Sequence, residues 1–212
     1  ILFENIPFLA NFLISPHQKI ALLYEFEEKL EKITEVTIDE NVTNLAGVPS
    51  WNLVMIKYIL KHTGKNNLLE IWPNLELFTH GGVSFTPYRK QFKKLIPTEK
   101  MNYLETYNAS EGFFGIQDNP SSDDMLLMLD YGVFYEFIQM EEFNKPNPKI
   151  HTVCNVEMNK NYAILISTNG GLWRYVIGDT IVFTSLYPHK FIISGAYFCK
   201  ITAFGEELII DN

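Results

Sequence analysis

The stretch EKMNYLETYNASEGFFGIQ, residues 99–117, contains a strand candidate, Met101 to Tyr107, that ends in the small polar run NASE at 108–111. A second strand candidate, Glu76 to Thr79, lies upstream and runs into HGG at 80–82. Two strands that both end in small polar residues are informative, because ligands of open α/β sheets lie at the carboxyl ends of strands. The stretch therefore predicts a ligand site at the edge of an α/β layer.

Helices are expected around this layer. Ser15-Pro16-His17-Gln18 has the pattern of a helix start, and apolar residues follow it at helical spacing: Ile20, Leu23, Phe26, Leu30 and Ile33. A second helix is expected from Pro49 to Gly64, because proline suits the first helical turn and glycine ends helices. A basic helix is expected over Tyr88 to Leu95. Strands alternating with helices predict an α/β fold.

The sequence changes character after a polar loop at 117–124. Met125–Asp130 and Val133–Ile138 flank Tyr131-Gly132 as in a hairpin, and NKPNPK at 144–149 is typical of a long turn. Short strands with turn residues between them then follow at Tyr162–Ser167, Leu172–Ile177, Ile181–Thr184 and Phe191–Ser194. This run predicts a small antiparallel sheet or barrel.

Composition excludes several classes of protein. The chain has 212 residues, of which 47 % are hydrophobic and 20 % charged, which is typical of a globular protein and not of a disordered one. No apolar run approaches the roughly 20 residues of a membrane helix, and no signal-peptide pattern follows Ile1. The net charge of −8 argues against nucleic-acid binding. Cys154 and Cys199 form no CxxC motif, so we expect buried thiols in a reduced, cytoplasmic protein.

The common short catalytic motifs are absent. The sequence contains no GxxxxGK[ST], GxGxxG, HExxH or GxSxG, and its five histidines are too scattered to suggest a metal cluster. Three segments still carry usable chemistry: HGGVS at 80–84, YNASEG at 107–112 and GGLWRYVIGD at 170–179. Each also has a plain structural interpretation as a turn at the end of a strand.

The residue types in these segments are also compatible with a nucleotide site, although spacing alone favours the plain turn for YNASEG. A ring such as Tyr107 can stack on a base, and a carboxylate such as Glu111 can hold Mg²⁺. Asp179, after Gly178, can accept hydrogen bonds from a ribose diol, as acidic residues do in dinucleotide sites. Arg174 is one of only two arginines, and a surface ion pair is its plain alternative role.

Taken together and in this order, the segments resemble the adenylate-forming enzyme superfamily. More narrowly, the chain resembles the auxin-responsive acyl-acid amido synthetases, particularly their bacterial members. The resemblance is carried by NVTNLAGVPSW (41–51), LLEIWPNLELFTHGGVSF (68–85), EKMNYLETYNASEGFFGIQ (99–117), NYAILISTNGGLWRYVIGDTIVFTS (161–185) and AFGEELIIDN (203–212).

The resemblance implies an enzyme that uses ATP and Mg²⁺ to convert a carboxylic acid into an acyl-adenylate. The acyl group then passes to the amine of an amino acid, and AMP is released. Carried over by position, the resemblance implies that Ser110 and Glu111 are the catalytic residues, Ser110 by touching phosphate and Glu111 by holding Mg²⁺. The implied nucleotide-binding residues are Tyr107, which would stack on adenine, Asp179, which would bind the ribose hydroxyls, and also Asn108, Ala109 and Ser110. Arg174 is a further nucleotide-binding candidate, with an orienting structural role as its alternative. Gly81 and Gly82 would bind the nucleotide where they border the adenine and acyl pockets, and His80, Val83 and Ser84 would form acyl-pocket wall.

The resemblance also predicts the organisation of the chain. We expect part of an adenylate-forming-enzyme N-terminal domain, with an α/β subdomain over 1–116, a β-rich, barrel-like subdomain over 117–194 and a hinge-proximal segment over 195–212. The family's phosphate loop and C-terminal cap domain are not in this sequence, so we expect the central part of a longer enzyme. Where the family has an arginine and a hinge residue, this chain has Ala196-Tyr197-Phe198.

Two alternatives follow from these observations. The acyl group could pass to coenzyme A instead of an amine, or the chain could be a binding module that lost the chemistry. A small carboxylic acid and an amino acid are the expected partners, with no nucleic acid and no membrane, and the oligomeric state is open.

Overall fold

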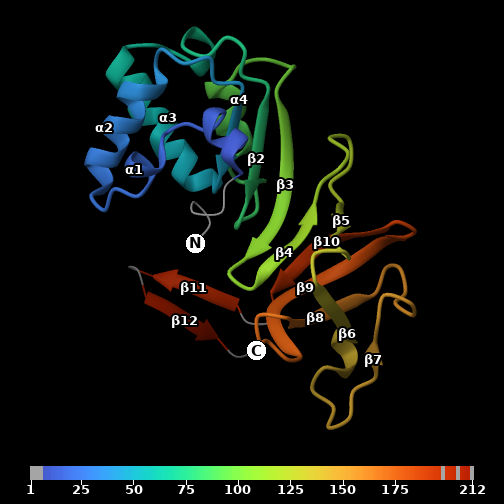
Figure 1. The fold of residues 1–212 in the computed structure, drawn as a ribbon. Coiled ribbons are helices and arrows are strands. Elements are labelled where there is room, and N and C mark those ends of the chain that lie inside the picture. Colours follow the sequence, from blue (N-terminus) through green and yellow to red (C-terminus); the bar gives the residue numbers. More distant parts are fainter. Residues whose placement is uncertain (1–6, 197–198, 204–205, 211–212) are drawn as a thin grey trace. The chain divides into compact units, whose positions relative to one another are not determined.

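The computed structural model describes residues 7–196, 199–203 and 206–210, and its contacts divide the chain into two compact units (Figure 1). Unit 1 ends at Tyr103, and unit 2 begins at Leu104. Each unit has its own core of buried side chains. The units are described separately below. The functional subdomain limits at 116 and 194 stay predictions.

Unit 1 is an α/β layer built on two parallel strands, β1 (Asn44–Gly47) and β2 (Leu77–Gly81). Helix α3 (Pro49–Thr63) connects them, which makes a β-α-β unit. The remaining helices of unit 1 are η2 (Phe8–Phe12), α1 (Gln18–Ala21), α2 (Phe26–Thr37), η3 (Leu68–Glu70) and α4 (Arg89–Leu95). The predicted α/β layer is confirmed.

The sequence located α3 and α4, but it missed η2 and η3 and misread the segment behind Ser15. Helix α3 begins at Pro49 and ends before Gly64, whose φ of 69° provides the left-handed cap that glycine adopts without strain. The single helix expected behind Ser15 is instead two helices, because the chain turns between Ala21 and Phe26. His17, and not Ser15, supplies the cap of the first helix.

The core of unit 1 lies between α3 and the strands. Ile56 and Phe78 are fully buried, and the ring of Phe92 stacks on Phe78 with 4.8 Å between the centroids. The indole Nε1 of Trp72 donates to the Thr37 carbonyl at 2.8 Å, so the end of α2 is tied to this core. Burial of large aromatic side chains is the main source of stability in such a layer.

Unit 2 is a mainly antiparallel sheet that begins with β3 (Asn102–Ala109), whose first residues belong to unit 1. Within unit 2 the strand order is β3-β4-β5-β10-β9-β8-β6-β7, and β11 and β12 form a separate antiparallel pair. The bounds of the further strands are β4 Gly112–Ile116, β5 Met125–Leu127, β6 Val133–Gln139, β7 Ile150–His151, β8 Asn161–Thr168, β9 Tyr175–Leu186, β10 His189–Ala196, β11 Cys199–Ala203 and β12 Glu206–Ile210. Helix η4 (Met140–Glu142) follows β6.

Three sequence expectations for unit 2 are wrong. The segments around Tyr131-Gly132 form no hairpin, because β5 pairs with β4 and β10 whereas β6 pairs with β8 and β7. The two strands expected on either side of Gly178-Asp179 are one long strand, β9, so these residues do not form a turn. Cys154 is exposed and free, not buried. Local pattern does not choose strand partners, which is why the hairpin failed.

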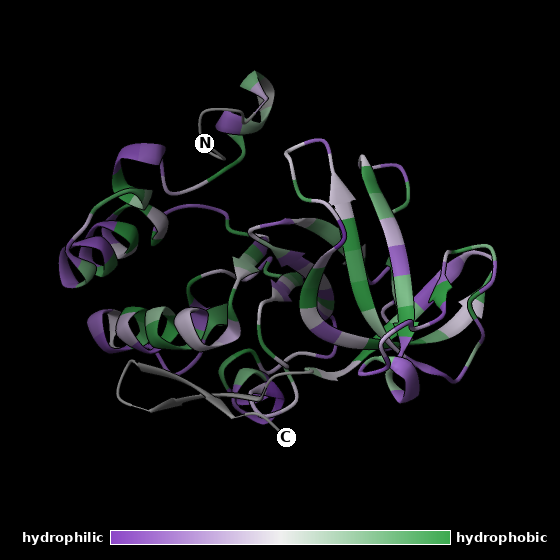
Figure 2. Cartoon of the chain, turned by 90° about the horizontal axis from the view of Figure 1, so that it is seen from below, coloured by the Kyte–Doolittle hydropathy of each residue, from purple (hydrophilic) through white to green (hydrophobic). Residues whose placement is uncertain are grey.

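The hydrophobic residues of unit 2 are concentrated in its strands. Figure 2 shows much of the hydrophobic colour on the strands and much of the hydrophilic colour on the connecting loops. Phe137, Tyr162, Phe183 and Phe191 are fully buried in one cluster. Among the described residues of the whole chain, no helix is long and apolar enough to cross a membrane.

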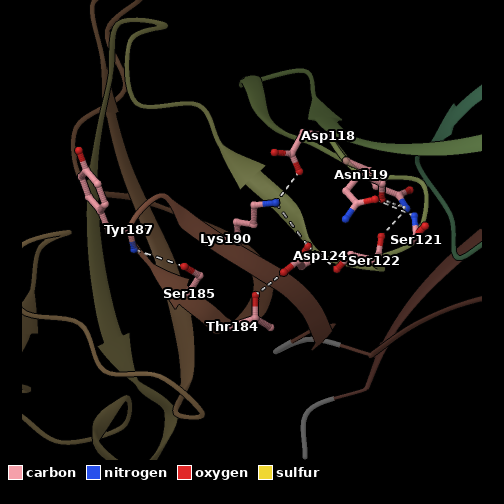
Figure 3. Close-up of polar contacts among 10 residues, drawn as sticks. Asp118, Asn119, Ser121, Ser122, Asp124, Thr184, Ser185, Tyr187 and Lys190 are labelled. Carbon is pink, nitrogen blue, oxygen red and sulfur yellow. Dashed lines mark hydrogen bonds and ion pairs between the residues drawn. The ribbon is translucent and has the colours of Figure 1, made fainter.

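The loop between β4 and β5 is held by polar contacts (Figure 3). Gln117, which is buried, donates to the carbonyl oxygens of Asn119 and Ser122 and accepts from the Glu105 amide. Asp124 accepts from the hydroxyls of Ser122 at 2.6 Å and Thr184 at 2.9 Å, and the Ser122 hydrogen bond is the main reason that its pKa is lowered. Polar composition predicted this loop, and these hydrogen bonds give it a defined shape.

Candidate nucleotide site

Asp179 lies at an irregular point of β9. Thr180 pairs with Ala163 of β8 and Val176 pairs with Leu165, so Ile177, Gly178 and Asp179 together stand opposite one residue. Gly178 has a φ of 102°, a left-handed value that side chains rarely adopt. Such a bulge redirects a side chain out of the alternation of the strand, and bulges are enriched beside functional sites.

The strand on the other side of Asp179 is also irregular. In β10, Ile193 pairs with Ile181 and Gly195 pairs with Thr180, which leaves Ser194 as the extra residue. The Ser194 hydroxyl lies 3.0 Å from the Thr180 hydroxyl and donates to Asn161 Oδ1 at 2.7 Å. Bulges in both flanking pairings therefore fix the backbone from which Asp179 extends.

Tyr107 reaches this carboxylate from β3. Its hydroxyl donates to Asp179 Oδ2 at 2.7 Å, although the two residues are 72 positions apart in the sequence. The Tyr107 side chain is only 6 % exposed and lies in the unit 2 core, with its ring centroid 5.2 Å from that of Phe114. Burial, followed by the hydrogen bond and charge of Asp179, raises the pKa of Tyr107 far above its usual value. The hydroxyl therefore remains a proton donor at physiological pH.

The tight turn between β3 and β4 carries the next candidate residues. Ser110 and Glu111 form the turn, and Asn108 and Ala109 lie at the exposed end of β3 and not in a loop as expected. Glu111 is partly buried, and its charge adds to the raised pKa of Tyr107, so the two side chains are electrostatic neighbours. The structure thus joins Tyr107 to Asp179 by a hydrogen bond, and Glu111 lies near enough for its charge to act on Tyr107.

Arg174 is engaged elsewhere. Its Nε donates to Glu136 Oε2 at 2.9 Å, and its backbone amide donates to the Ser167 hydroxyl. Its φ of 47° is in the left-handed region, which is uncommon for an arginine. An exposed ion pair of this kind contributes little stability, so its main effect is to orient the turn before β9.

The remaining candidates belong to unit 1, at the end of β2. Gly81 closes β2, and Gly82 follows with a φ of 81°, a conformation that favours glycine. A Cβ on Gly82 would lie 3.4 Å from the Val48 side chain. Val83 and Ser84 are exposed in the loop that follows.

His80 is buried among aromatic rings. Its ring stacks on Phe85 at 4.2 Å between centroids and lies 5.4 Å from Phe78. Burial, with the nearby charge of Arg89 as a second cause, lowers the pKa of His80 to about 4. A neutral, enclosed imidazole forms part of a wall and is a poor general base at neutral pH.

The sequence interpretation missed three residues that support the backbone around Asp179: Ser194, Thr180 and Asn161. They act through the backbone bulge beside Asp179, and amino-acid composition does not predict that bulge. The hydroxyl contact of Tyr107 was missed too, because it depends on the curvature of the sheet. Gly178 was the one available signal, since an isolated glycine within a strand pattern suggests a bulge.

The fold of the chain is shared with solved structures of an acyl acid amido synthetase and of an acyl-CoA ligase. A solved structure described as GH3.15 acyl acid amido synthetase superimposes with a TM-score of 0.71 at 14 % identity, covering 91 % of this chain and 44 % of that one. An open conformation of 2-hydroxyisobutyryl-CoA ligase gives 0.59 at 10 % identity, covering 85 % of this chain and 42 % of that one. At these identities the likeness concerns the fold alone.

The chain belongs to the GH3 family. The model of the GH3 family N-terminal domain matches residues 1–101, and that of the GH3 family central domain matches residues 126–193, so together they match well over half of the chain. Indole-3-acetic acid-amido synthetase GH3.3 of Arabidopsis thaliana is 24 % identical over 168 residues, covering 74 % of this chain and 27 % of that protein. Probable indole-3-acetic acid-amido synthetase GH3.2 of Oryza sativa subsp. japonica is 23 % identical over 174 residues, with the same two shares. The chain thus spans about a quarter of the length of these relatives.

Proposed function

We propose that this chain is the adenosine-binding part of an ATP-dependent acyl-acid amido synthetase. The whole protein would join the carboxylate of an acid to the α-phosphate of ATP with release of pyrophosphate. The amine of an amino acid would then displace AMP to give an amide. The observation that carries the proposal is the Asp179 carboxylate, fixed at a double bulge and contacted by Tyr107, in a chain of the GH3 family.

The roles of the unit 2 residues follow from their chemistry. Asp179 would accept hydrogen bonds from the two ribose hydroxyls, and Ser110 would donate to a phosphate oxygen. Glu111 would hold Mg²⁺ on the phosphates. Mg²⁺ bound with a nucleotide needs only one or two protein carboxylates, so a single acidic side chain at the turn is a suitable donor. The ion would neutralise phosphate charge during attack by the acid.

Tyr107 would lie beside the adenine, and Asn108 and Ala109, at the end of β3, would make further contacts with the nucleotide. Tyr107 is buried, so stacking on the base would require one face of its ring to become accessible when the nucleotide binds. Arg174, held by Glu136, would orient the segment that leads to Asp179. In unit 1, taken by itself, Gly81 and Gly82 would let the backbone approach a flat ligand closely, with His80, Val83 and Ser84 as acyl-pocket wall.

Nucleotide binding by the 212-residue chain is the direct test. Calorimetry with AMP and with ATP–Mg²⁺ should show weak binding, and Asp179→Ala should reduce affinity by about 100-fold or more, since two hydrogen bonds to a charged group are lost. The Asp130→Ala variant, whose side chain lies in an exposed turn of unit 2, is the control and should bind as the unmodified chain does. No binding by the unmodified chain at millimolar nucleotide would contradict the proposal.

The acceptor is tested in the longer protein. Acid-dependent exchange of pyrophosphate into ATP is expected there, whereas the 212-residue chain should bind nucleotide without turnover. Supplying amino acids, hydroxylamine and coenzyme A in parallel separates amide formation from thioester formation. We propose that the acceptor is an amino acid, because the curated relatives are named amido synthetases. We also propose a cytoplasmic location, because the acid and amino acid substrates occur there.

A further inference from the structure

We propose that the Tyr107 hydroxyl is a positioning group for Asp179, and that it sets the carboxylate orientation on which recognition of the ribose hydroxyls depends. This inference rests on the proposed ribose-binding role of Asp179. It assigns to Tyr107 a second task, separate from any contact of its ring with the base. The hydroxyl and the ring can be tested apart, because phenylalanine keeps the ring.

The geometry leaves one side of the carboxylate for a ligand. Tyr107 donates to Oδ2 of Asp179 at 2.7 Å, a short charge-assisted hydrogen bond. A carboxylate can accept about four hydrogen bonds, so the contacts among the described residues leave Oδ1 and the second lone pair of Oδ2 for two ribose hydroxyls. The bulge at Gly178 fixes the backbone, and the tyrosyl hydroxyl restrains the two remaining rotations of the Asp179 side chain, about the Cα–Cβ and Cβ–Cγ bonds.

The donor itself cannot move far. Tyr107 is enclosed by unit 2 core rings, with Phe114 at 5.2 Å and Phe191 at 6.1 Å between centroids. A buried aromatic side chain of this kind has few accessible rotamers. The hydroxyl is therefore a preorganised donor, and its proton is retained because burial and Asp179 raise its pKa.

The contact also joins two distant strands of the sheet. Strands β4, β5 and β10 lie between β3 and β9 in the sheet order. In a flat sheet four such steps would separate β3 from β9 by about 19 Å, well beyond the reach of a tyrosine. The sheet must therefore curl, and the hydrogen bond couples β9, which carries Asp179, to the β3–β4 turn, which carries Ser110 and Glu111. The ribose and phosphate sides of the site would thereby keep a fixed spacing.

The alternative is that the hydrogen bond only stabilises the curled sheet. The two roles differ in sugar selectivity. A positioning role makes the loss of the hydroxyl specific for nucleotides that carry ribose hydroxyls, whereas a structural role weakens the binding of all nucleotides equally.

The test is a cycle of two variants and two nucleotides. Calorimetry on the 212-residue chain compares AMP with 2′,3′-dideoxy-AMP, for the unmodified chain, Tyr107→Phe and Tyr135→Phe. Tyr135 is the matched control, because it is a buried tyrosine of the same core whose hydroxyl donates to the Met128 carbonyl at 3.1 Å. Urea unfolding of both variants verifies that they fold.

We expect Tyr107→Phe to weaken AMP binding by about 5-fold and to leave dideoxy-AMP binding within 2-fold of the unmodified chain. Tyr135→Phe should retain the unmodified preference for AMP. Equal weakening of both nucleotides by Tyr107→Phe, or an unchanged preference for AMP, would overturn the positioning role. If the unmodified chain binds neither nucleotide, the proposed function itself has failed, which is a different result.

A second variant keeps the test decisive if Tyr107→Phe does not fold. In Asp179→Asn, the tyrosyl proton should select the amide oxygen and leave the NH₂ group facing the ribose. The preference for AMP over dideoxy-AMP should then fall below that of the unmodified chain, because the NH₂ group can donate to the ribose oxygens but cannot accept their protons. A preference retained at the unmodified level would overturn the proposal.

Discussion

Each unit buries one titratable ring among its candidate ligand-binding residues, but the surroundings of the two rings differ. In unit 1, His80 stacks on Phe85, and burial together with the charge of Arg89 holds it neutral. In unit 2, Tyr107 donates to the carboxylate of Asp179. An apolar enclosure removes a charge from a site, whereas a buried donor keeps a charge in place and orients it. Unit 1 thus presents a neutral wall, and unit 2 presents a directed anion.

The two units also differ in how the chain reaches these positions. Unit 1 uses a local β-α-β connection in which β1 and β2 are joined through α3. Unit 2 joins β3 to β9 across a curled antiparallel sheet with bulged pairings. Local connections are encoded in neighbouring residues, and long-range ones depend on the whole sheet.

The largest expected effect tests whether the two cores are separate. Phe78→Ala in unit 1 and Phe183→Ala in unit 2 should each lower the free energy of unfolding by about 3–5 kcal/mol, because both side chains are fully buried. Hydrogen–deuterium exchange should show lost protection mainly in the unit that carries the change. Phe134→Ala, with a side chain that is 59 % exposed, is the control and should change little. Equal loss in both units would show that they share one cooperative core.

The next effect concerns the neutral wall of unit 1. The pKa of His80 is lowered to about 4 in the folded chain against about 6.5 in the unfolded chain, so the unfolded state binds more protons between these values. Stability should therefore fall by roughly 2–3 kcal/mol as the pH is lowered from 6.5 to 4. Urea unfolding at a series of pH values measures this slope, and His80→Gln should flatten it. The same slope in the variant would mean that His80 is not its source.

A smaller loss of stability is expected when a methyl group is added to the packed core of unit 2. A Cβ on Gly115 would lie 2.7 Å from Phe191 Cζ and 3.3 Å from Met125 Cβ, so Gly115→Ala should cost about 1–3 kcal/mol through overpacking. Gly170→Ala is the matched control, because its Cβ would meet only the Thr168 hydroxyl at 3.5 Å. Thermal unfolding of the two variants compares them. A Gly115→Ala variant as stable as Gly170→Ala would show that the β4 region is looser than the structure indicates.

The smallest effect is expected at the loop of Figure 3. Lys190 Nζ lies 2.7 Å from Asp118 and 3.9 Å from Asp124, and ion pairs at the protein surface add little stability even when they are partly covered. Lys190→Met should shift the urea midpoint slightly, and added salt should shrink the difference because it screens the pair. A large, salt-independent loss would show that the loop depends on Lys190 for its shape and not on Gln117.

Sequence pattern predicted the local elements well. Helix α3 with its glycine cap, helix α4, strand β2 and strand β8 all lie where apolar periodicity and turn residues placed them. Strand β1 was missed, because four residues carry too little pattern to separate a strand from a loop. The false hairpin around Tyr131-Gly132 has the opposite cause, since a good turn signal does not ensure that its flanks pair.

The sequence by itself determined the α/β class, the family and the residue types of the candidate site, because motif order and side-chain chemistry are written along the chain. Only the tertiary structure decided that Tyr107 meets Asp179, that Ser194 and Gly178 bulge beside it, and that Arg174 turns to Glu136. These contacts depend on sheet curvature and strand register. Both are set by the packing of many side chains at once, and a local stretch of sequence does not carry that information.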